Sequence, residues 1–120
     1  MDDCIFCKIA NGEIPSKTIY EDEIVKVYLD INPIATGHTL IIPKKHFTDL
    51  DDIDMKTINH IMKVAKDIKK LLEEKLGAKG IKLIQNNGVF QDVKHYHLHL
   101  IPDCNVTKKE LDEVYEILTK

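Results

Sequence analysis

Three histidines alternate along a short stretch of this sequence, His95, His97 and His99, and apolar or aromatic residues separate them. In a β-strand, side chains two positions apart lie on the same face, about 6.6 Å from each other. A helix, with its period of 3.6 residues, would spread the same three around its axis. Neutral imidazole can serve as a metal ligand, a general base or a nucleophile. The alternation therefore predicts a strand over residues 95–102 that carries chemistry on one face.

A second chemical pattern is the pair Cys4 and Cys7, which are separated by two residues. By itself this spacing is consistent with half of a zinc site, a redox dithiol or two buried thiols. The redox interpretation needs a thioredoxin-like context, which the neighbouring residues do not predict. A zinc site needs two further ligands from elsewhere in the chain. The third cysteine, Cys104, is predicted to be a plain thiol.

Hydrophobic periodicity and turn residues indicate the strands that must position these groups. The two strands nearest the N-terminus are expected to pair as a hairpin. A short helix should precede that hairpin, over residues 4–10. The expected strands are residues 18–21, 24–30, 38–42, 81–85 and 95–102.

The longest helix is expected to begin after an N-cap at Asp54 and to end at Gly77. Its apolar residues recur at three- and four-residue steps, and His60 lies off that stripe, where we expect it to face solvent. A capping box, Thr107-x-x-Glu110, predicts a tail helix that runs to about Leu118. The order of elements predicts an α+β domain with an antiparallel sheet of about five strands, one long helix and short terminal helices. The predicted apolar stripe is Ile58, Ile61, Met62, Ala65, Ile68, Leu72 and Leu76.

The composition is that of an ordinary globular protein, and it excludes several classes. The 120 residues suit one domain, residues 1–120, with 43% hydrophobic and 31% charged residues and a net charge of −3. No basic tract suggests nucleic-acid binding, and no apolar run approaches the ~20 residues that span a membrane. The N-terminal residues do not resemble a secretory signal. An odd number of cysteines favours a reducing compartment, so we expect a cytoplasmic protein.

The alternating histidines, followed by Leu100-Ile101-Pro102, resemble the signature of the histidine-triad (HIT) nucleotide-binding superfamily. Three further segments, residues 4–15, 29–46 and 86–88, resemble other blocks of that family in the same order. The C-x-x-C pair is similar to that of bacterial- or archaeal-type members. The resemblance covers residues 4–102 and leaves the tail, residues 103–120, unassigned. It implies the HIT-like fold.

The resemblance implies a nucleotide hydrolase. Such enzymes release a nucleoside monophosphate, here expected to be AMP, from a leaving group on its α-phosphate, as in phosphoramidates or adenylyl-amines. His97 corresponds to the nucleophile that forms a nucleotidyl-histidine intermediate, and water then hydrolyses that intermediate. His99 and His38 correspond to groups that hold phosphate oxygens or orient the attacking ring. The family needs no metal for this step.

The same resemblance implies the residues that bind the nucleotide. Asp30 matches the position that holds the ribose hydroxyls, and an acidic acceptor suits two hydroxyl donors. Alternation places Tyr28 and Asp30 on one strand face, as binding of base beside ribose requires. Apolar residues match the base pocket, and two polar residues match the phosphate side. The implied set is Phe6, Ile9, Tyr28 and Ile31 for the base, and Asn86 and Gln91 for the phosphate.

The resemblance also implies a structural zinc ion. Relatives with this C-x-x-C pair use two histidines as the remaining ligands, and by position these are His46 and His95. The implied Cys₂His₂ set is then Cys4, Cys7, His46 and His95. In that case the lone pair of His95 goes to metal, and His95 takes no part in acid or base chemistry.

The loop before the histidines departs from the family pattern. It is shorter, Phe90 replaces a glycine, and Asp92 replaces a small polar residue near the phosphate, where its charge would repel an anion. Two alternatives therefore stay open beside the hydrolase. One is a nucleotide-binding or regulatory module with structural zinc and little turnover. The other is a catalytic zinc site on the histidine stripe, which lacks an adjacent acidic base.

The family forms homodimers by joining two sheets, so the resemblance implies a homodimer.

Overall fold

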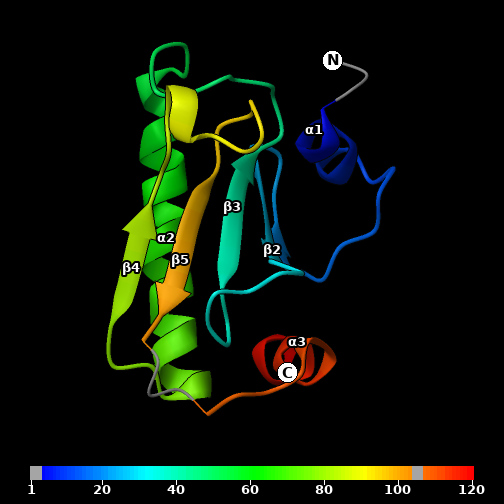
Figure 1. Cartoon of the computed structure of the whole chain (residues 1–120), viewed down its shortest axis with the longest axis vertical. Helices are drawn as coiled ribbons and strands as arrows, with labels where there is room; N and C mark the ends of the chain where they lie inside the picture. Colours follow the sequence, from blue (N-terminus) through cyan, green and yellow to red (C-terminus); the bar gives the residue numbers. More distant parts are fainter. Residues whose placement is uncertain (1–3, 104–106) are drawn as a thin grey trace.

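A computed structural model describes residues 4–103 and 107–120. Within these residues the chain forms one antiparallel sheet in the order β1-β2-β3-β5-β4, flanked by helices (Figure 1). The expected α+β architecture is confirmed. None of the helices in the described ranges has the length and apolar character that crossing a bilayer requires. The elements are α1 (Ile5–Ala10), β1 (Thr18–Glu21), β2 (Val25–Leu29), β3 (Thr39–Pro43), α2 (Met55–Leu76), β4 (Ile81–Ile84), the 3₁₀ turn η1 (Gly88–Phe90), β5 (Leu98–Pro102) and α3 (Leu111–Thr119).

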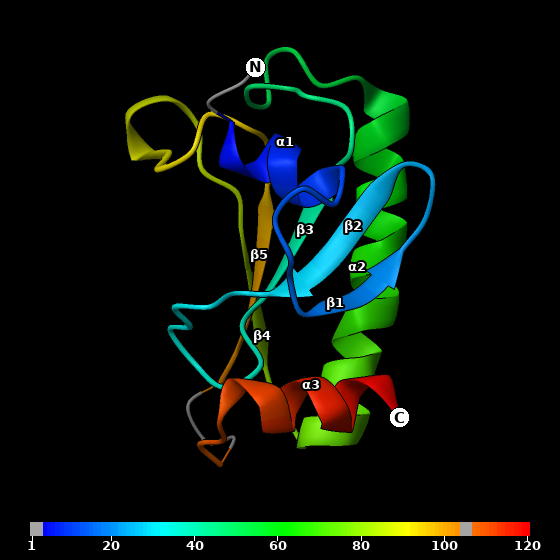
Figure 2. The same cartoon turned by 90° about the vertical axis from the view of Figure 1, so that its right-hand side faces the viewer.

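Different helices cover the two faces of the sheet (Figure 2). On one face, alternate residues of β2 such as Val25 and Val27 pack with α2 and α3 in the main core. On the other face, Tyr28, Leu40 and Ile42 pack against the short helix α1 in a smaller cluster. This division follows from the two-residue period of strand side chains.

The long helix α2 has the predicted ends. The carboxylate of Asp54 accepts a hydrogen bond from the backbone N–H of Thr57, and Gly77 adopts a left-handed φ of 73°. The predicted apolar stripe is wrong at one position: Met62 is exposed, and Val64 is buried instead. Met62 and Val64 lie on opposite sides of the buried Ile61 around the helix axis, so the apolar periodicity alone did not show which of the two faces the sheet.

The histidine strand is shorter than predicted, because β5 begins at Leu98 rather than at residue 95. Its ladder with β3 ends where Ile41 pairs with Leu98. Before that point the backbone N–H of Tyr96 donates instead to the carbonyl of Phe47, in the loop that follows β3. The predicted alternation nevertheless persists, because Tyr96 and Leu98 lie in the main core.

The predicted capping box at the tail is wrong. Glu110 is itself the N-cap of α3, with an extended backbone and no side-chain capping bond, and Thr107 lies outside the helix. The backbone N–H of Lys109 donates to the hydroxyl of Thr36, which holds this segment against another loop. A tertiary contact therefore delays the helix start. The prediction for Cys104 lies outside the described residues.

His60 does not simply face solvent, contrary to expectation. Its Nε2 lies 2.7 Å from the carboxylate of Asp22 in the β1–β2 turn. The same carboxylate accepts hydrogen bonds from the backbone N–H groups of Ile24 and Val25 and from the hydroxyl of Tyr20. Burial by itself would raise the pKa of Asp22, but these donors outweigh it and hold the pKa well below its usual range.

We expect Asp22→Ala to lower the free energy of unfolding by about 2–4 kcal/mol at pH 7, because it removes the acceptor for several donors. A carboxylate with a lowered folded-state pKa stabilises fully above its unfolded pKa of about 3.9, and this contribution is lost as pH falls. Urea unfolding should therefore show a constant gap from wild type above about pH 5 and a narrowing gap below about pH 4. The exposed Asp67→Ala serves as the control. A gap that widens toward low pH would contradict this assignment.

Candidate functional site

A cavity of about 520 Å³ lies where α1, the end of β2 and the histidine segment meet. Most of the residues that the sequence singled out for substrate binding or catalysis line it. Two do not: Asn86 and Gln91 lie outside its lining. The predicted residues that the structure brings together here are Phe6, Ile9, Tyr28, Asp30, Ile31, His38, His97 and His99.

One wall of the cavity is apolar and comes mainly from α1. The ring of Phe6 meets His97 edge to face, with ring centroids 4.8 Å apart. A buried lysine secures this helix, because Lys26 Nζ donates to the carbonyl of Ile9 at 2.9 Å. A cation suits the C-terminal end of a helix, where carbonyl groups lack partners. Sequence reasoning missed Lys26; a lysine within an otherwise apolar strand was the available signal.

Tyr28 lies beneath the same helix and is buried. Among the described residues no hydrogen-bond partner reaches its hydroxyl. Burial raises the pKa of Tyr28, and the negative charges of Asp30 and Cys4 add to the effect. The phenol therefore stays protonated near neutral pH.

His97 is held in one tautomer by its own chain. Its Nδ1–H donates to the backbone carbonyl of His95 at 2.7 Å, so Nε2 keeps its lone pair. Burial lowers the pKa of His97, opposed by that hydrogen bond and by the charges of Asp92 and Asp30. A neutral ring with a free lone pair inside a cavity is suited to nucleophilic attack.

His38 and His99 form a connected pair. The backbone N–H of Ile34 donates to His38 Nδ1 at 3.1 Å, so the proton of a neutral His38 must sit on Nε2. That Nε2–H donates to His99 Nδ1 at 2.9 Å. His99 therefore carries its own proton on Nε2, which becomes a donor. Burial lowers the pKa of both rings, that of His99 to about 4, so both are neutral at pH 7.

Asp30, His38 and His99 have ligand atoms within 4.8 Å of one another, yet they do not suit a metal ion. A metal on His38 Nε2 would require a proton on Nδ1, where the N–H of Ile34 already donates. The Asp30 carboxylate instead accepts from the backbone N–H of Asn32 at 2.9 Å. Its other oxygen lies 3.6 Å from His38 Nε2.

Gly37 allows the chain to turn into His38. Its φ is +88°, and a Cβ there would come within 2.6 Å of Leu76 Cδ1 and 3.2 Å of Pro102 Cγ. A side chain at this position would meet both backbone strain and close packing against α2 and β5. The glycine therefore lets the turn just before His38 approach α2 and β5 closely.

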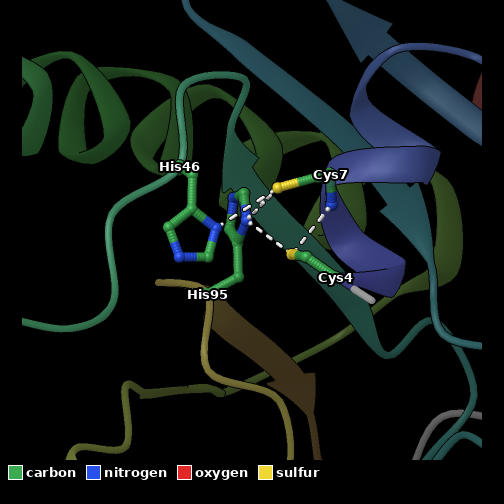
Figure 3. Close-up of side chains that lie close together, drawn as sticks. All are labelled: Cys4, Cys7, His46 and His95. Atoms are coloured by element: carbon green, nitrogen blue, oxygen red, sulfur yellow. Dashed lines mark hydrogen bonds between the residues drawn. The ribbon is translucent and has the colours of Figure 1, made fainter. Parts of the chain in front are cut away.

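The second functional cluster is Cys4, Cys7, His46 and His95, whose ligand atoms all lie within 4.8 Å of one another (Figure 3). Sulfur-to-Nδ1 distances are 3.3 Å for Cys4–His95, 3.2 Å for Cys7–His46 and 3.4 Å for Cys7–His95. In a tetrahedral zinc site, bond lengths of about 2.3 Å to sulfur and 2.0–2.1 Å to nitrogen give such separations of about 3.6 Å. The four side chains form a candidate metal site with the chemistry that zinc prefers.

The tautomer of His95 supports a ligand role. Its Nε2–H donates to the carbonyl of Pro43 at 2.9 Å, so the Nδ1 lone pair faces the two sulfurs. Cys4 is also the N-cap of α1, where its sulfur accepts from the backbone N–H of Cys7. Burial, followed by the neighbouring Cys4, raises the pKa of Cys7 to about 11. A cation between the sulfurs would remove that penalty.

The two polar residues outside the cavity have other surroundings. Gln91 is buried, and its amide nitrogen donates to the carbonyl of Thr48 at 2.7 Å. Its side-chain oxygen has no partner among the described residues. Asn86 is half-buried, and its carbonyl accepts from the side chain of Gln85. Asp92, whose charge was expected to repel an anion near the phosphate, does line the cavity.

Comparison with known proteins matches residues 11–106 to the HIT domain. A HIT-like protein of Methanocaldococcus jannaschii that is described as uncharacterized is 50% identical over 102 residues, which cover 82% of this chain and 78% of that protein. An adenosine 5′-monophosphoramidase of Saccharomyces cerevisiae is 45% identical over 101 residues, covering 82% of this chain and 61% of the relative.

A solved structure shows the same fold with a metal. It is a Zn-bound histidine triad family protein from Mycobacterium smegmatis, 36% identical, with a TM-score of 0.89. The match covers 98% of this chain and 91% of that protein.

Proposed function

Because the chain belongs to the HIT family, we propose that it is a nucleotide hydrolase that releases AMP from an amine or related leaving group on the α-phosphate. The observation that carries the proposal is the free Nε2 of His97, which follows from the hydrogen bond of its Nδ1–H to the carbonyl of His95. The name of the yeast relative, an AMP phosphoramidase, supports the substrate class.

In this proposal the cavity is divided along its length. The base is a flat aromatic ring system, and it packs in the apolar part of the cavity. The residues that contact it there are Phe6, Ile9, Tyr28 and Ile31. Asp30, at the end of β2, accepts from the ribose hydroxyls. His97 and His99 then face the α-phosphate, and Asn86 and Gln91 support the neighbouring loop.

The reaction proceeds in two steps. His97 Nε2 attacks phosphorus, a bond from nitrogen to phosphorus forms, and the bond to the leaving amine breaks as that amine takes up a proton from water. Water then attacks phosphorus, the bond to His97 breaks, and AMP and a neutral His97 are released, while the proton that this water loses neutralises the hydroxide left by the first step. The Nε2–H of His99 stabilises charge on a phosphate oxygen, and phosphoryl transfer depends largely on such positioning and charge stabilisation.

We propose that the candidate metal site holds zinc for structure. Cys4, Cys7, His46 and His95 would bind it, and zinc would supply no chemistry beyond joining these segments. Because the carbonyl of His95 orients His97, fixing His95 also fixes the attacking ring. All four ligands come from the protein, whereas a catalytic zinc keeps a position open for water or substrate. This argues against the catalytic-zinc alternative.

A nucleotide-binding module with little turnover is the second candidate. The short loop favours it, because Asn86 and Gln91 lie outside the cavity lining and Val89 and Phe90 are exposed. Such a protein would bind AMP and would not release it from a phosphoramidate.

We also propose that the protein forms a homodimer through β4. This strand is an edge of the sheet, and it exposes Leu83 and Ile84, while Val89 and Phe90 are exposed in the following turn. An apolar edge strand invites pairing with a second copy. A mass of one chain in solution would contradict this.

We propose that the protein is located in the cytoplasm, because a reducing compartment keeps cysteine thiols free to bind a metal.

The proposed function is tested by trapping its intermediate. Adenosine 5′-phosphoramidate is mixed with the protein for milliseconds, the reaction is stopped with alkaline denaturant, and digested peptides are weighed. We expect one adenylyl group on the peptide that contains His97, since phosphorus–nitrogen bonds survive alkali. An adduct on another residue would refute the mechanism, and AMP binding without turnover would favour the module.

A further inference from the structure

The cavity that contains His97 has an unusual charge for a site that handles a phosphate ester. Among the described residues that line it, the only charged side chains at neutral pH are the carboxylates of Asp30 and Asp92. Neither lysine nor arginine lines it within those residues. A phosphate-binding site more often supplies cations.

The two carboxylates differ in their partners. Asp30 accepts from the backbone of Asn32 and lies beside His38, so its position is fixed by the fold. Asp92 is exposed, and within residues 4–103 and 107–120 no hydrogen bond or ion pair engages its side chain. Lys94, two residues along the chain, forms no ion pair with it among the described residues, and Lys94 Nζ instead donates to the carbonyl of Gly88 at 2.6 Å.

Asp92 nevertheless lies close to the reacting groups. It lines the same cavity as His97 and His99. Burial lowers the pKa of His99, and the negative charge of Asp92 opposes that shift, as expected for a carboxylate near the ring. The proposed function assigns Asp30 to the nucleoside, and it therefore leaves Asp92, the other carboxylate of the lining, for the leaving group.

We propose that Asp92 selects the leaving group by charge: it favours an amine that carries a second, cationic ammonium group and disfavours an anionic group such as diphosphate. This inference rests on the proposed function. In the step concerned, the phosphorus–nitrogen bond breaks and the leaving nitrogen takes a proton from water, while the remote ammonium stays charged throughout. A carboxylate without a paired cation attracts an ammonium group on the leaving amine and repels a phosphate group on the leaving group.

The experiment compares two adenosine 5′-phosphoramidates of matched length, one made from 1,4-diaminobutane and one from n-pentylamine. For the wild type at low salt, we expect kcat/KM to be about 3- to 30-fold higher for the cationic substrate, with the ratio falling as salt screens the charge. Asp92→Asn should bring the ratio close to unity. Asp67→Asn removes the same charge from α2, outside the cavity lining, and should leave the ratio unchanged.

The possible outcomes distinguish a failure of this inference from a failure of the proposed function. Turnover of both substrates with a ratio near unity in the wild type overturns the role of Asp92 and leaves the hydrolase intact. If the preference for the cationic substrate is unchanged in Asp92→Asn, the role of Asp92 is likewise overturned and the hydrolase stays intact. If neither substrate is hydrolysed, the proposed function fails and the inference fails with it.

Discussion

Replacing His97 with alanine is expected to lower kcat for adenosine 5′-phosphoramidate by at least about 10³-fold, because the variant has no nucleophile in the cavity. Among the described imidazoles that line the cavity, His97 is the one whose ring lone pair the hydrogen bonds leave free, since its Nδ1–H donates to the carbonyl of His95. His99 cannot replace it, because its Nδ1 accepts from His38 and its Nε2 carries the proton. Steady-state and single-turnover kinetics on the phosphoramidate measure the loss.

AMP binding provides the control for this variant. Alanine removes the contact with Phe6 but leaves Asp30 and Tyr28 in place. We therefore expect calorimetry to show an affinity for AMP within about tenfold of wild type, since one lost contact of this kind costs about 1 kcal/mol. Loss of turnover together with loss of binding would indicate a collapsed cavity instead. Unchanged turnover would refute the assignment of His97.

Removal of the proposed zinc ion is expected to have the largest effect on stability. A chelator, or Cys7→Ser, should lower the free energy of unfolding by about 3–5 kcal/mol, because metal that binds only the folded state stabilises it by mass action. For a domain of this size the melting temperature should fall by roughly 15 °C. If zinc joins Cys4 and Cys7 to His95 as proposed, its removal should also weaken the attachment of α1 and so loosen the apolar wall of the cavity.

The same experiment distinguishes structural from catalytic zinc. Well below the new melting temperature, the chelated protein should still turn over substrate, more slowly, and added zinc should restore both stability and rate. Complete loss of turnover in protein that remains folded would show that the metal takes part in chemistry. An unchanged melting temperature after metal removal, with metal content measured in parallel, would refute the zinc assignment.

Much of the fold was predictable because its determinants are local. The N-cap at Asp54 and the left-handed Gly77 define both ends of α2 within a few residues of the chain. Alternation assigned the histidines to one face of the sheet and Tyr96 and Leu98 to the other. These patterns depend on the helix and strand periods, which any chain obeys.

The local rules failed where distant segments compete for the same backbone. The histidine strand begins only at Leu98 because the N–H of Tyr96 bonds to the carbonyl of Phe47 rather than to β3. The tail helix starts late because Lys109 is held by Thr36. His60 pairs with Asp22, 38 residues away, which no helical periodicity reveals.

The residue types and their spacing were enough to single out the side chains that are candidates for chemistry: the alternating histidines, the cysteine pair and Asp30. The possible role of each histidine, by contrast, depends on contacts between distant segments of the folded chain. The carbonyls of His95 and Pro43 and the N–H of Ile34 select the tautomers. These tautomers leave a free lone pair on Nε2 of His97, make Nε2 of His38 a donor and turn Nδ1 of His95 toward the sulfurs. Cys4 and His95, 91 residues apart, meet only in the folded chain. Residue types are local information, whereas the direction of a lone pair depends on partners that folding brings from elsewhere.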